Sequence, residues 1–270
     1  MPVDFTLNDA TTLPALGFGL YKVPPELTEQ VIADGVAAGY RLVDGAEFYG
    51  NEEEVGRALQ HVDRAALRVT SKFWGEESQS RGAVLRSFDA SEKALDTHID
   101  IYMIHWPRPA RNQYVDVWRT LIELRDAGRV TTIGVSNFTE AHIQRLIDET
   151  GVTPAINQVE SHPWLPQHDL RAFHAAHGIV TQAWSPLGRG RVLQDPTLAA
   201  IAERLDVTVA QVIIRWHLQL GGALIPKSTH PERLRQNNDV DGFELSEADM
   251  STIARLETGQ RTGTHPDDRQ

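Results

Sequence analysis

The regular alternation of short apolar runs with amphipathic stretches is the feature that most constrains the fold of this chain. Eight such runs can be counted, and most are too short to be anything but buried strands. They span residues 16–20, 41–45, 68–72, 100–105, 131–137, 155–160, 179–185 and 223–228. A series of this kind predicts βα units around a parallel sheet.

The stretches between the runs have the periodicity of helices that pack on a sheet. One of them has apolar residues along a single face: Val209, Val212, Ile213, Trp216 and Leu220. Another begins at Tyr114 and ends before Gly128, a residue typical of a helix C-terminus. Ser246 and Asp249 resemble the capping box of a last helix.

One closed barrel is the organisation that we expect. The 270 residues exceed the usual domain length of about 150, but α/β barrels of about 250 residues are routinely single domains. No linker rich in Pro, Gly or Ser interrupts the series. The sequence therefore predicts an α/β fold, a single (β/α)8 TIM barrel over residues 1–270, with a short polar C-terminal tail from Gly259 that forms a mobile loop.

Composition and charge restrict the partners. Hydrophobic residues make up 41% of the chain, and the net charge of −11 repels nucleic acid and anionic membranes. The absence of Cys excludes disulfides, thiolate catalysis and Cys-ligated metals. No run approaches the length of a membrane span, and the first residues do not resemble a signal peptide. We expect a cytoplasmic enzyme or binding protein for a small molecule, with no nucleic-acid or membrane partner, and a monomer is favoured.

Polar residues follow the predicted strands at their C-terminal ends, where the active sites of such barrels lie. They are Asp44, Lys72, His105, Ser136, Asn137, Gln158, Trp184, Ser185, Lys227 and Ser228. Because each follows an apolar run directly, the barrel prediction places them in one ring around a single mouth.

Four residues at this predicted mouth suggest proton-transfer chemistry. Asp44 and Lys72 end the second and third strands, within reach of a salt bridge, and Tyr49 lies on the loop after Asp44. A nearby ammonium would lower the pKa of the Tyr49 phenol, so that this group donates a proton near neutral pH. His105 would hydrogen-bond the same substrate oxygen. Each residue alone is more often structural, but four in matched positions favour a site.

Seven segments resemble the signature segments of the aldo-keto reductases. They are GYRLVDGAEFYGNEEEVG (39–56), SKFW (71–74), IHWP (104–107), IGVSNF (133–138), INQVESHP (156–163), WSPLGRG (184–190) and IPKSTHPERLRQN (225–237). They recur in family order over nearly the whole chain. Through WSPLGRG and the brief C-terminus, the sequence is most similar to the bacterial 2,5-diketo-D-gluconate reductases.

The resemblance implies an NADPH-dependent reduction of aldehyde or ketone carbonyls to alcohols. It implies a catalytic tetrad of Asp44, Tyr49, Lys72 and His105, with Tyr49 as the general acid. It also implies NADPH bound without a Rossmann unit, with the nicotinamide on Trp184 and its carboxamide held by Ser136, Asn137 and Gln158. The loop from Leu187 to Gly190 would lie along the pyrophosphate, and Ser185, Leu187 and Gly188 are counted among the cofactor-binding residues. The 2′-phosphate would lie at Lys227, Ser228 and Arg233, and the adenine at Asn237. Lys and Arg are also the donors that a phosphate requires.

Two departures from the family pattern stand in this sequence. The family segment D-T-A has Gly45 at its second position, which leaves the tetrad intact but is expected to loosen its packing. In the family segment R-I-x-E-N, Gln236 replaces the carboxylate, which alters the expected adenine contacts.

Aromatic side chains near the tetrad are expected to form the substrate walls. The residues are Tyr21, Phe48, Trp74 and Trp106, with Trp164 and Arg261 as weaker candidates. Ordinary core packing remains the alternative for Trp106.

Two other enzyme classes require residue patterns that this sequence lacks or shows only in part. A metal-dependent hydrolase needs clustered His ligands, and the sequence has neither H-x-H nor HExxH, so we expect no metal site. His174 and His177 are expected to face solvent. A glycosidase needs two carboxylates, for which Asp44 and Glu160 qualify by position only. The remaining alternative is a catalytically quiescent regulatory protein that binds a nicotinamide nucleotide.

Overall fold

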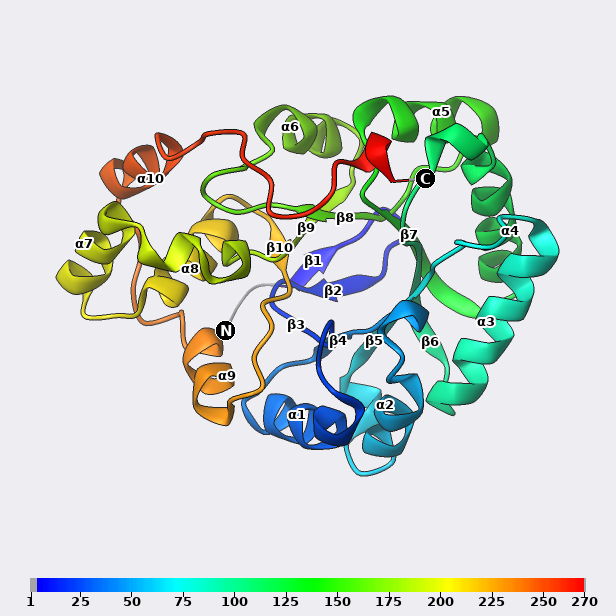
Figure 1. Cartoon of the computed structure of the whole chain (residues 1–270), viewed down its shortest axis with the longest axis horizontal. Helices are drawn as coiled ribbons and strands as arrows, with labels where there is room; N and C mark the ends of the chain where they lie inside the picture. The colour runs from blue at the N-terminus through cyan, green and yellow to red at the C-terminus, as the bar shows by residue number, and fades with distance from the viewer. Residues whose placement is uncertain (1–3, 270) are drawn as a thin grey trace.

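A computed structural model describes residues 4–269 and contains a barrel of parallel strands surrounded by helices (Figure 1). The barrel strands are β3 (Phe18–Gly19), β4 (Leu42–Asp44), β5 (Arg68–Phe73), β6 (Ile99–Ile104), β7 (Val130–Ser136), β8 (Ile156–Glu160), β9 (Val180–Trp184) and β10 (Ala223–Leu224). Each pairs in parallel with the next along the chain. The predicted (β/α)8 barrel is confirmed.

Backbone hydrogen bonds between the segments around β3 and β10 close the barrel. The amide of Gly17 donates to the carbonyl of Leu224 at 3.0 Å, and the amide of Leu224 donates to the carbonyl of Ala15 at 2.9 Å. Both strands are shorter than the runs 16–20 and 223–228 predicted. Pro226 lacks an N–H group and cannot donate to the ladder, although its carbonyl accepts from the amide of Gly19 at 3.2 Å.

The helices cover the outside of the barrel (Figure 1). They are α1 (Pro25–Ala37), α2 (Glu52–Leu59), α3 (Arg81–Leu95), α4 (Tyr114–Asp126), α5 (Glu140–Thr150), α6 (His168–Ala176), α7 (Pro196–Leu205), α8 (Val209–Gln219), α9 (Pro231–Asn238) and α10 (Glu247–Ala254). Gly128, with φ of 70°, follows α4, and Ser246 and Asp249 form the capping box of α10, as predicted. Within residues 4–269, no helix combines the length and apolarity that a membrane crossing requires.

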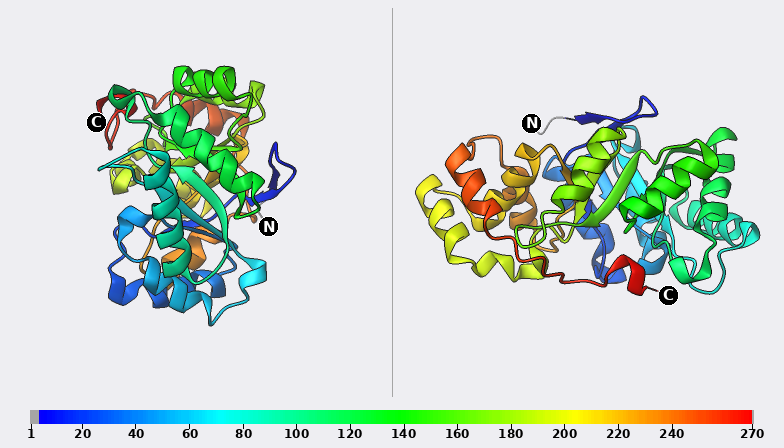
Figure 2. Two further views of the ribbon diagram at one scale, coloured as in Figure 1. Left: turned by 90° about the vertical axis from the view of Figure 1, so that its right-hand side faces the viewer. Right: turned by 90° about the horizontal axis from the view of Figure 1, so that it is seen from above.

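A hairpin that the sequence analysis did not find covers the N-terminal ends of the barrel strands. It consists of β1 (Asp4–Thr6) and β2 (Thr12–Pro14). Its turn is held by a hydrogen bond of 2.8 Å from Thr132 Oγ1 of β7 to Asp9. Leu7 and Leu13 pack against apolar side chains of the barrel interior, including Met103. The hairpin and the C-terminal tail lie at opposite ends of the barrel (Figure 2).

The C-terminal tail is fixed to the barrel, so the prediction of a mobile loop is wrong. The amide and the hydroxyl of Thr262 each donate to Glu160 Oε1 at 2.5 Å, and the amide of Gly263 donates at 3.1 Å. The tail then forms a helical turn at Pro266–Asp268. A buried carboxylate at the end of β8 therefore holds the tail across the end of the barrel where the strands terminate.

Candidate active site

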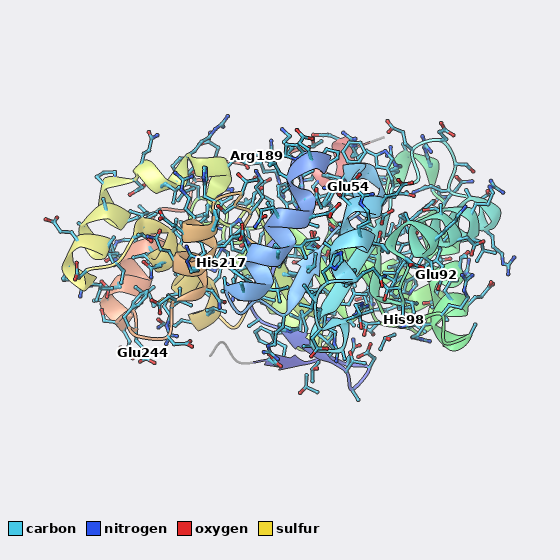
Figure 3. The ribbon with its side chains drawn as sticks, turned by 90° about the horizontal axis from the view of Figure 1, so that it is seen from below. Glu54, Glu92, His98, Arg189, His217 and Glu244 are labelled. Carbon is cyan, nitrogen blue, oxygen red and sulfur yellow. The ribbon has the colours of Figure 1, made fainter. Side chains whose placement is uncertain are left out.

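A cavity of about 940 Å³ opens at the C-terminal ends of the barrel strands. The sequence predicted most of its lining: Tyr21, Asp44, Phe48, Tyr49, Trp74, His105, Trp106, Ser136, Asn137, Gln158, Trp184, Ser185, Leu187, Lys227, Ser228, Arg233 and Asn237. Arg189, another lining residue, lies at the tail end of the barrel, whereas His98 lies near the hairpin end (Figure 3). The ring of polar residues thus surrounds one mouth.

The two other predicted residues are buried beneath this wall. Lys72 has an exposed fraction of 0% and lies behind Asp44. Gly188 is packed against Val192 and has a φ of 55°, a conformation that glycine adopts without strain. Gly188 therefore occupies a position in the loop after β9 where any larger side chain would clash with Val192.

Asp44 and Lys72 form a buried ion pair below the cavity. Lys72 Nζ donates to both carboxylate oxygens of Asp44 at 2.8 Å, and to the carbonyl of Gly45 at 2.8 Å. Gln158 Nε2 donates to Asp44 Oδ1 at 2.7 Å. Burial lowers the pKa of Lys72, although the charge of Asp44 acts in the opposite direction. The carboxylate thus holds the ammonium in place.

Gly45 does not loosen this arrangement. Its amide donates to the carbonyl of Thr70 at 3.0 Å, and its own carbonyl accepts from Lys72. A Cβ atom at this position would lie 3.1 Å from the Thr70 oxygen, closer than ordinary contact. The glycine that replaces the family threonine therefore fits a tight approach between β4 and β5.

Tyr49 lies directly above the ion pair, with its hydroxyl 3.3 Å from Lys72 Nζ. Burial raises the pKa of Tyr49 well above its usual value, and the negative charge of Asp44 raises it further. The expectation that Lys72 would lower this pKa is wrong. Because Asp44 neutralises the ammonium at short range, little net positive charge remains to favour a phenolate.

His105 follows β6 and is 8% exposed. Its ring meets the rings of Tyr49 and Trp74 edge to face, with centroids 5.9 Å and 5.0 Å away. Burial lowers the pKa of His105 well below its usual value, and the charge of Lys72 lowers it further. A neutral imidazole therefore stands beside the Tyr49 phenol.

A second group of side chains forms a polar network next to the residues of the predicted tetrad. Trp184 Nε1 donates to Asn137 Oδ1 at 2.8 Å, and Asn137 Nδ2 donates to the carbonyl of His105 at 3.0 Å. Ser136 Oγ donates to the carbonyl of Gln158 at 2.8 Å. The amide nitrogen of Gln158 is used by Asp44 and Gln182, which leaves its oxygen for the cavity. This network fixes the orientation of the Trp184 indole.

The far end of the cavity is lined by cations. Lys227 and Arg233 are both exposed there, and Ser228 accepts a hydrogen bond of 3.1 Å from the amide of His230 at the start of α9. Asn237 and Gln236 line the same end. The charge and donors at this end suit a phosphate.

Aromatic rings and a tail residue form the wall near Tyr49. Phe48 and Trp74 are stacked with centroids 3.8 Å apart, and the ring centroid of Tyr21 lies 5.2 Å from that of Tyr49. Arg269, which the sequence analysis missed, lines the cavity with its guanidinium 4.7 Å from the Trp74 ring. No sequence signal pointed to Arg269, because only the fold of the tail brings it there.

The weaker candidates and the rival sites lie elsewhere. Trp164 contributes to a separate surface pocket, and Arg261 lies 3.9 Å from Glu160. His174 is fully buried, against the expectation that it faces solvent. Its polar ring can be buried because Asn157 and Thr181 each form a hydrogen bond with one of its nitrogens. Glu160 is occupied by the tail. Among residues 4–269, no group of His, Asp and Glu side chains is arranged to hold a metal ion.

A model of the aldo/keto reductase family matches residues 15–258. The chain belongs to the aldo/keto reductase family. An aldo-keto reductase of Mycobacterium sp. strain KMS is 49% identical over 263 residues, which cover 96% of this chain and 95% of that protein. The 2,5-diketo-D-gluconic acid reductase B of a Corynebacterium species is 45% identical over 266 residues, covering 97% and 96%.

The structure of this reductase is also similar to solved structures. A crystal structure of a Gox0644 mutant in complex with NADPH has a TM-score of 0.96 and 43% identity, and the match covers 100% of this chain and 99% of that one. The predicted family and the oxidoreductase class are therefore confirmed, and a 2,5-diketo-D-gluconic acid reductase is among the relatives, in line with the predicted resemblance. The roles of the individual residues, the cytoplasmic location and the monomeric state stay predictions.

Proposed function

We propose that this aldo/keto reductase uses NADPH to reduce an aldehyde or ketone of small size to the alcohol, with Tyr49 as the general acid. The observation that carries this proposal is the hydroxyl of Tyr49, which lines the cavity and lies 3.3 Å from the buried Lys72 ammonium. A phenol in this position meets the substrate on one side and a fixed cation on the other.

The side chains that line the cavity supply the chemistry that NADPH binding requires. Lys227 and Arg233 supply positive charge at the end that we assign to the 2′-phosphate, and Asn237 lies beside them for the adenine. The pyrophosphate would lie along the loop of Ser185 and Leu187, which line the cavity. The Trp184 indole, fixed by its hydrogen bond to Asn137, offers a flat surface for the nicotinamide. When bound, NADPH supplies the hydride.

The protein residues orient the carbonyl and supply the proton. His105 is neutral, so its imidazole retains one N–H group that donates to the carbonyl oxygen and positions it beside Tyr49. Tyr49 holds its proton at neutral pH, because the pKa of a phenol is ordinarily about 10 and burial raises that of Tyr49 further. As the carbonyl carbon is reduced, its oxygen becomes an alkoxide, a stronger base than a phenolate, and takes the proton from Tyr49.

The ion pair keeps Tyr49 in its working position. Lys72 has its charge matched by Asp44, and its ammonium also lies 3.3 Å from the Tyr49 hydroxyl. The hydrogen bond of 3.3 Å from Lys72 Nζ keeps the Tyr49 oxygen in place before and after proton transfer. A quiescent nucleotide-binding protein would have no need of this buried pair below a cavity, and this favours catalysis over the regulatory alternative.

Replacement of Tyr49 by phenylalanine tests the proposal. The new ring keeps the packing but has no proton, so we expect kcat to fall by about 10²- to 10⁴-fold, the usual contribution of a positioned acid. NADPH should still bind, which is measured by the quenching of tryptophan fluorescence. Tyr40→Phe is the matched control, because the buried Tyr40 hydroxyl has no hydrogen-bond partner among the described residues. A Tyr49→Phe variant with more than about a tenth of wild-type kcat would contradict the role of Tyr49.

A further inference from the structure

A second hollow, of about 530 Å³, opens on the surface beside the loop that follows β9. Its volume lies within the range of about 300 to 1,000 Å³ that small-molecule sites occupy. Six residues line this outer hollow: Trp164, Arg189, Gly190, Arg191, Gln194 and Gln260. Arg189 and Gly190 also line the cavity of the active site, so the two spaces share one short segment of chain as a wall.

Both arginines of the outer hollow are exposed, and neither side chain forms a hydrogen bond or ion pair with another residue of 4–269. None of the described residues that line the hollow is an Asp or Glu. Asp195, the carboxylate nearest to them in the sequence, caps α7 by accepting from the amide of Thr197 at 2.9 Å. On a chain with a net charge of −11, two guanidinium groups without a counter-ion in the described structure indicate a site for an anion.

The other side chains of the outer hollow add a flat surface and hydrogen-bonding groups. Trp164 is half-buried and packs on the apolar cluster of α7 and α8, and its carbonyl accepts from the amides of Thr258 and Gly259 at 3.1 and 3.0 Å. A fixed indole of this kind can stack on a planar ring. The carboxamides of Gln194 and Gln260 make no hydrogen bond within the described part of the chain, so they are available to donate and accept.

The backbone of Arg189 is in a left-handed conformation, with a φ of 54° and a ψ of 34°. Its neighbours Gly188 and Gly190 have φ angles of 55° and 86°. A glycine adopts such angles without strain, whereas an arginine pays a conformational cost. Strained residues of this kind cluster at ligand sites, and the side chain of this one lines two cavities.

We propose that the outer hollow binds a small phosphate monoester that carries a planar ring, and that this ligand lowers the affinity for NADPH through Arg189. A phosphate monoester is close to a dianion at neutral pH and matches the forks of Arg189 and Arg191. Its ring lies against Trp164. The proposal rests on the position assigned above to the pyrophosphate of NADPH and adds a regulatory site to the proposed function.

The link between the two sites follows from the shared guanidinium. The pyrophosphate is assigned to the loop of Ser185 and Leu187, directly before Arg189 in the chain. One guanidinium cannot form two parallel hydrogen bonds with two phosphates at once, and the second anion adds negative charge beside the first. The outer ligand therefore weakens NADPH binding, and NADPH weakens the outer ligand by the same factor.

Phenyl phosphate is the probe for the outer hollow. Isothermal titration calorimetry measures its binding to cofactor-free Arg233→Ala, which lacks the arginine assigned to the 2′-phosphate of NADPH. We expect a dissociation constant of about 1 mM or less, and an increase of about tenfold when Arg191→Gln is added. Cyclohexyl phosphate has the same charge but no planar ring, so it should bind about 2- to 10-fold more weakly.

The dissociation constant of NADPH, measured by tryptophan fluorescence at rising concentrations of phenyl phosphate, tests the link. In the wild type it should increase by about fivefold or more and then reach a plateau, because both ligands can be bound together. Arg191→Gln is the matched variant, since Arg191 lines the outer hollow and not the cofactor cavity. It should bind NADPH as the wild type does and show little response to phenyl phosphate. Sodium chloride at equal ionic strength controls for screening.

Four results would overturn the proposal. The absence of binding up to about 10 mM phenyl phosphate, or binding that Arg191→Gln leaves unchanged, would refute the site. A rise in the dissociation constant of NADPH without a plateau would place the probe in the cofactor cavity, and a constant value would refute the link through Arg189. If NADPH itself does not bind, the proposed function fails, whereas calorimetry with phenyl phosphate alone still decides whether the outer hollow is a site.

Discussion

Removal of the Asp44 charge should destabilise the whole barrel, because Lys72 would keep a buried charge without its counter-ion. The two side chains are 1% and 0% exposed, and the ammonium contacts both carboxylate oxygens at 2.8 Å. Removing one partner of a buried pair costs about 3 to 5 kcal/mol. The carbonyl of Gly45 and the hydroxyl of Tyr49 remain in Asp44→Asn, but neither carries charge.

Urea unfolding of four proteins measures this effect: the wild type, Asp44→Asn, Lys72→Met and the double variant. Each single variant leaves one buried charge or forces its neutralisation, whereas the double variant leaves neither. We therefore expect the double variant to lose less free energy of unfolding than the sum of the single losses, with a coupling energy of about 2 kcal/mol or more. Its stability should recover without any recovery of kcat, because Tyr49 still lacks the cation beside its hydroxyl.

Two results would refute this reasoning. A loss below about 1 kcal/mol in Asp44→Asn would mean that the ammonium is solvated or neutral in the barrel. Strict additivity of the single losses in the double variant would mean that the two side chains do not act as a pair.

Two further predictions concern the cofactor and the buried histidine. Arg233→Ala should weaken NADPH binding by about 10- to 100-fold and leave NADH binding nearly unchanged, because only NADPH carries the 2′-phosphate. Equal increases in the dissociation constants of both nucleotides would show that Arg233 supports the loop structure and does not bind the phosphate. Burial lowers the pKa of His174 to about 3. Because the unfolded chain takes up this proton below about pH 6.5 and the folded chain does not, stability is present at neutral pH and falls as the pH falls. Between pH 7 and pH 5 the wild type should lose about 2 kcal/mol more than His174→Gln in urea unfolding, and identical pH dependence in both proteins would contradict the burial argument.

The parts of the site that the sequence predicted are those that local chain geometry determines. Asp44, Lys72 and His105 each follow an apolar run, and a parallel barrel brings all such positions to one end. The order of strands along the chain equals their order in the sheet, so no unusual topology intervened. The positions of these residues therefore required only the strand ends and the type of barrel.

The parts that the sequence missed depend on contacts between distant segments. The hairpin at Asp4–Pro14 has strands of three residues, too short to give a periodic signal, and it is held by Thr132 far along the chain. The tail is polar and has no periodicity, yet Thr262 bonds to Glu160, 102 residues earlier. Glu160 was recognised only as a carboxylate at a strand end, and nothing in its neighbourhood revealed that its partners would be backbone amides of the tail.

Tyr49 shows how a correct position can accompany a wrong electrostatic argument. The sequence indicated one cation near the phenol, which alone would favour the phenolate. In the structure, burial raises the pKa of Tyr49, and the carboxylate of Asp44, which the sequence analysis had already placed within reach of Lys72, lies 2.8 Å from that cation and offsets its charge. A raised pKa keeps the acid fully protonated at neutral pH. The thermodynamic drive for proton transfer then comes from the basicity of the developing alkoxide, and the contribution of Lys72 and Asp44 is to hold the hydroxyl where that oxygen forms.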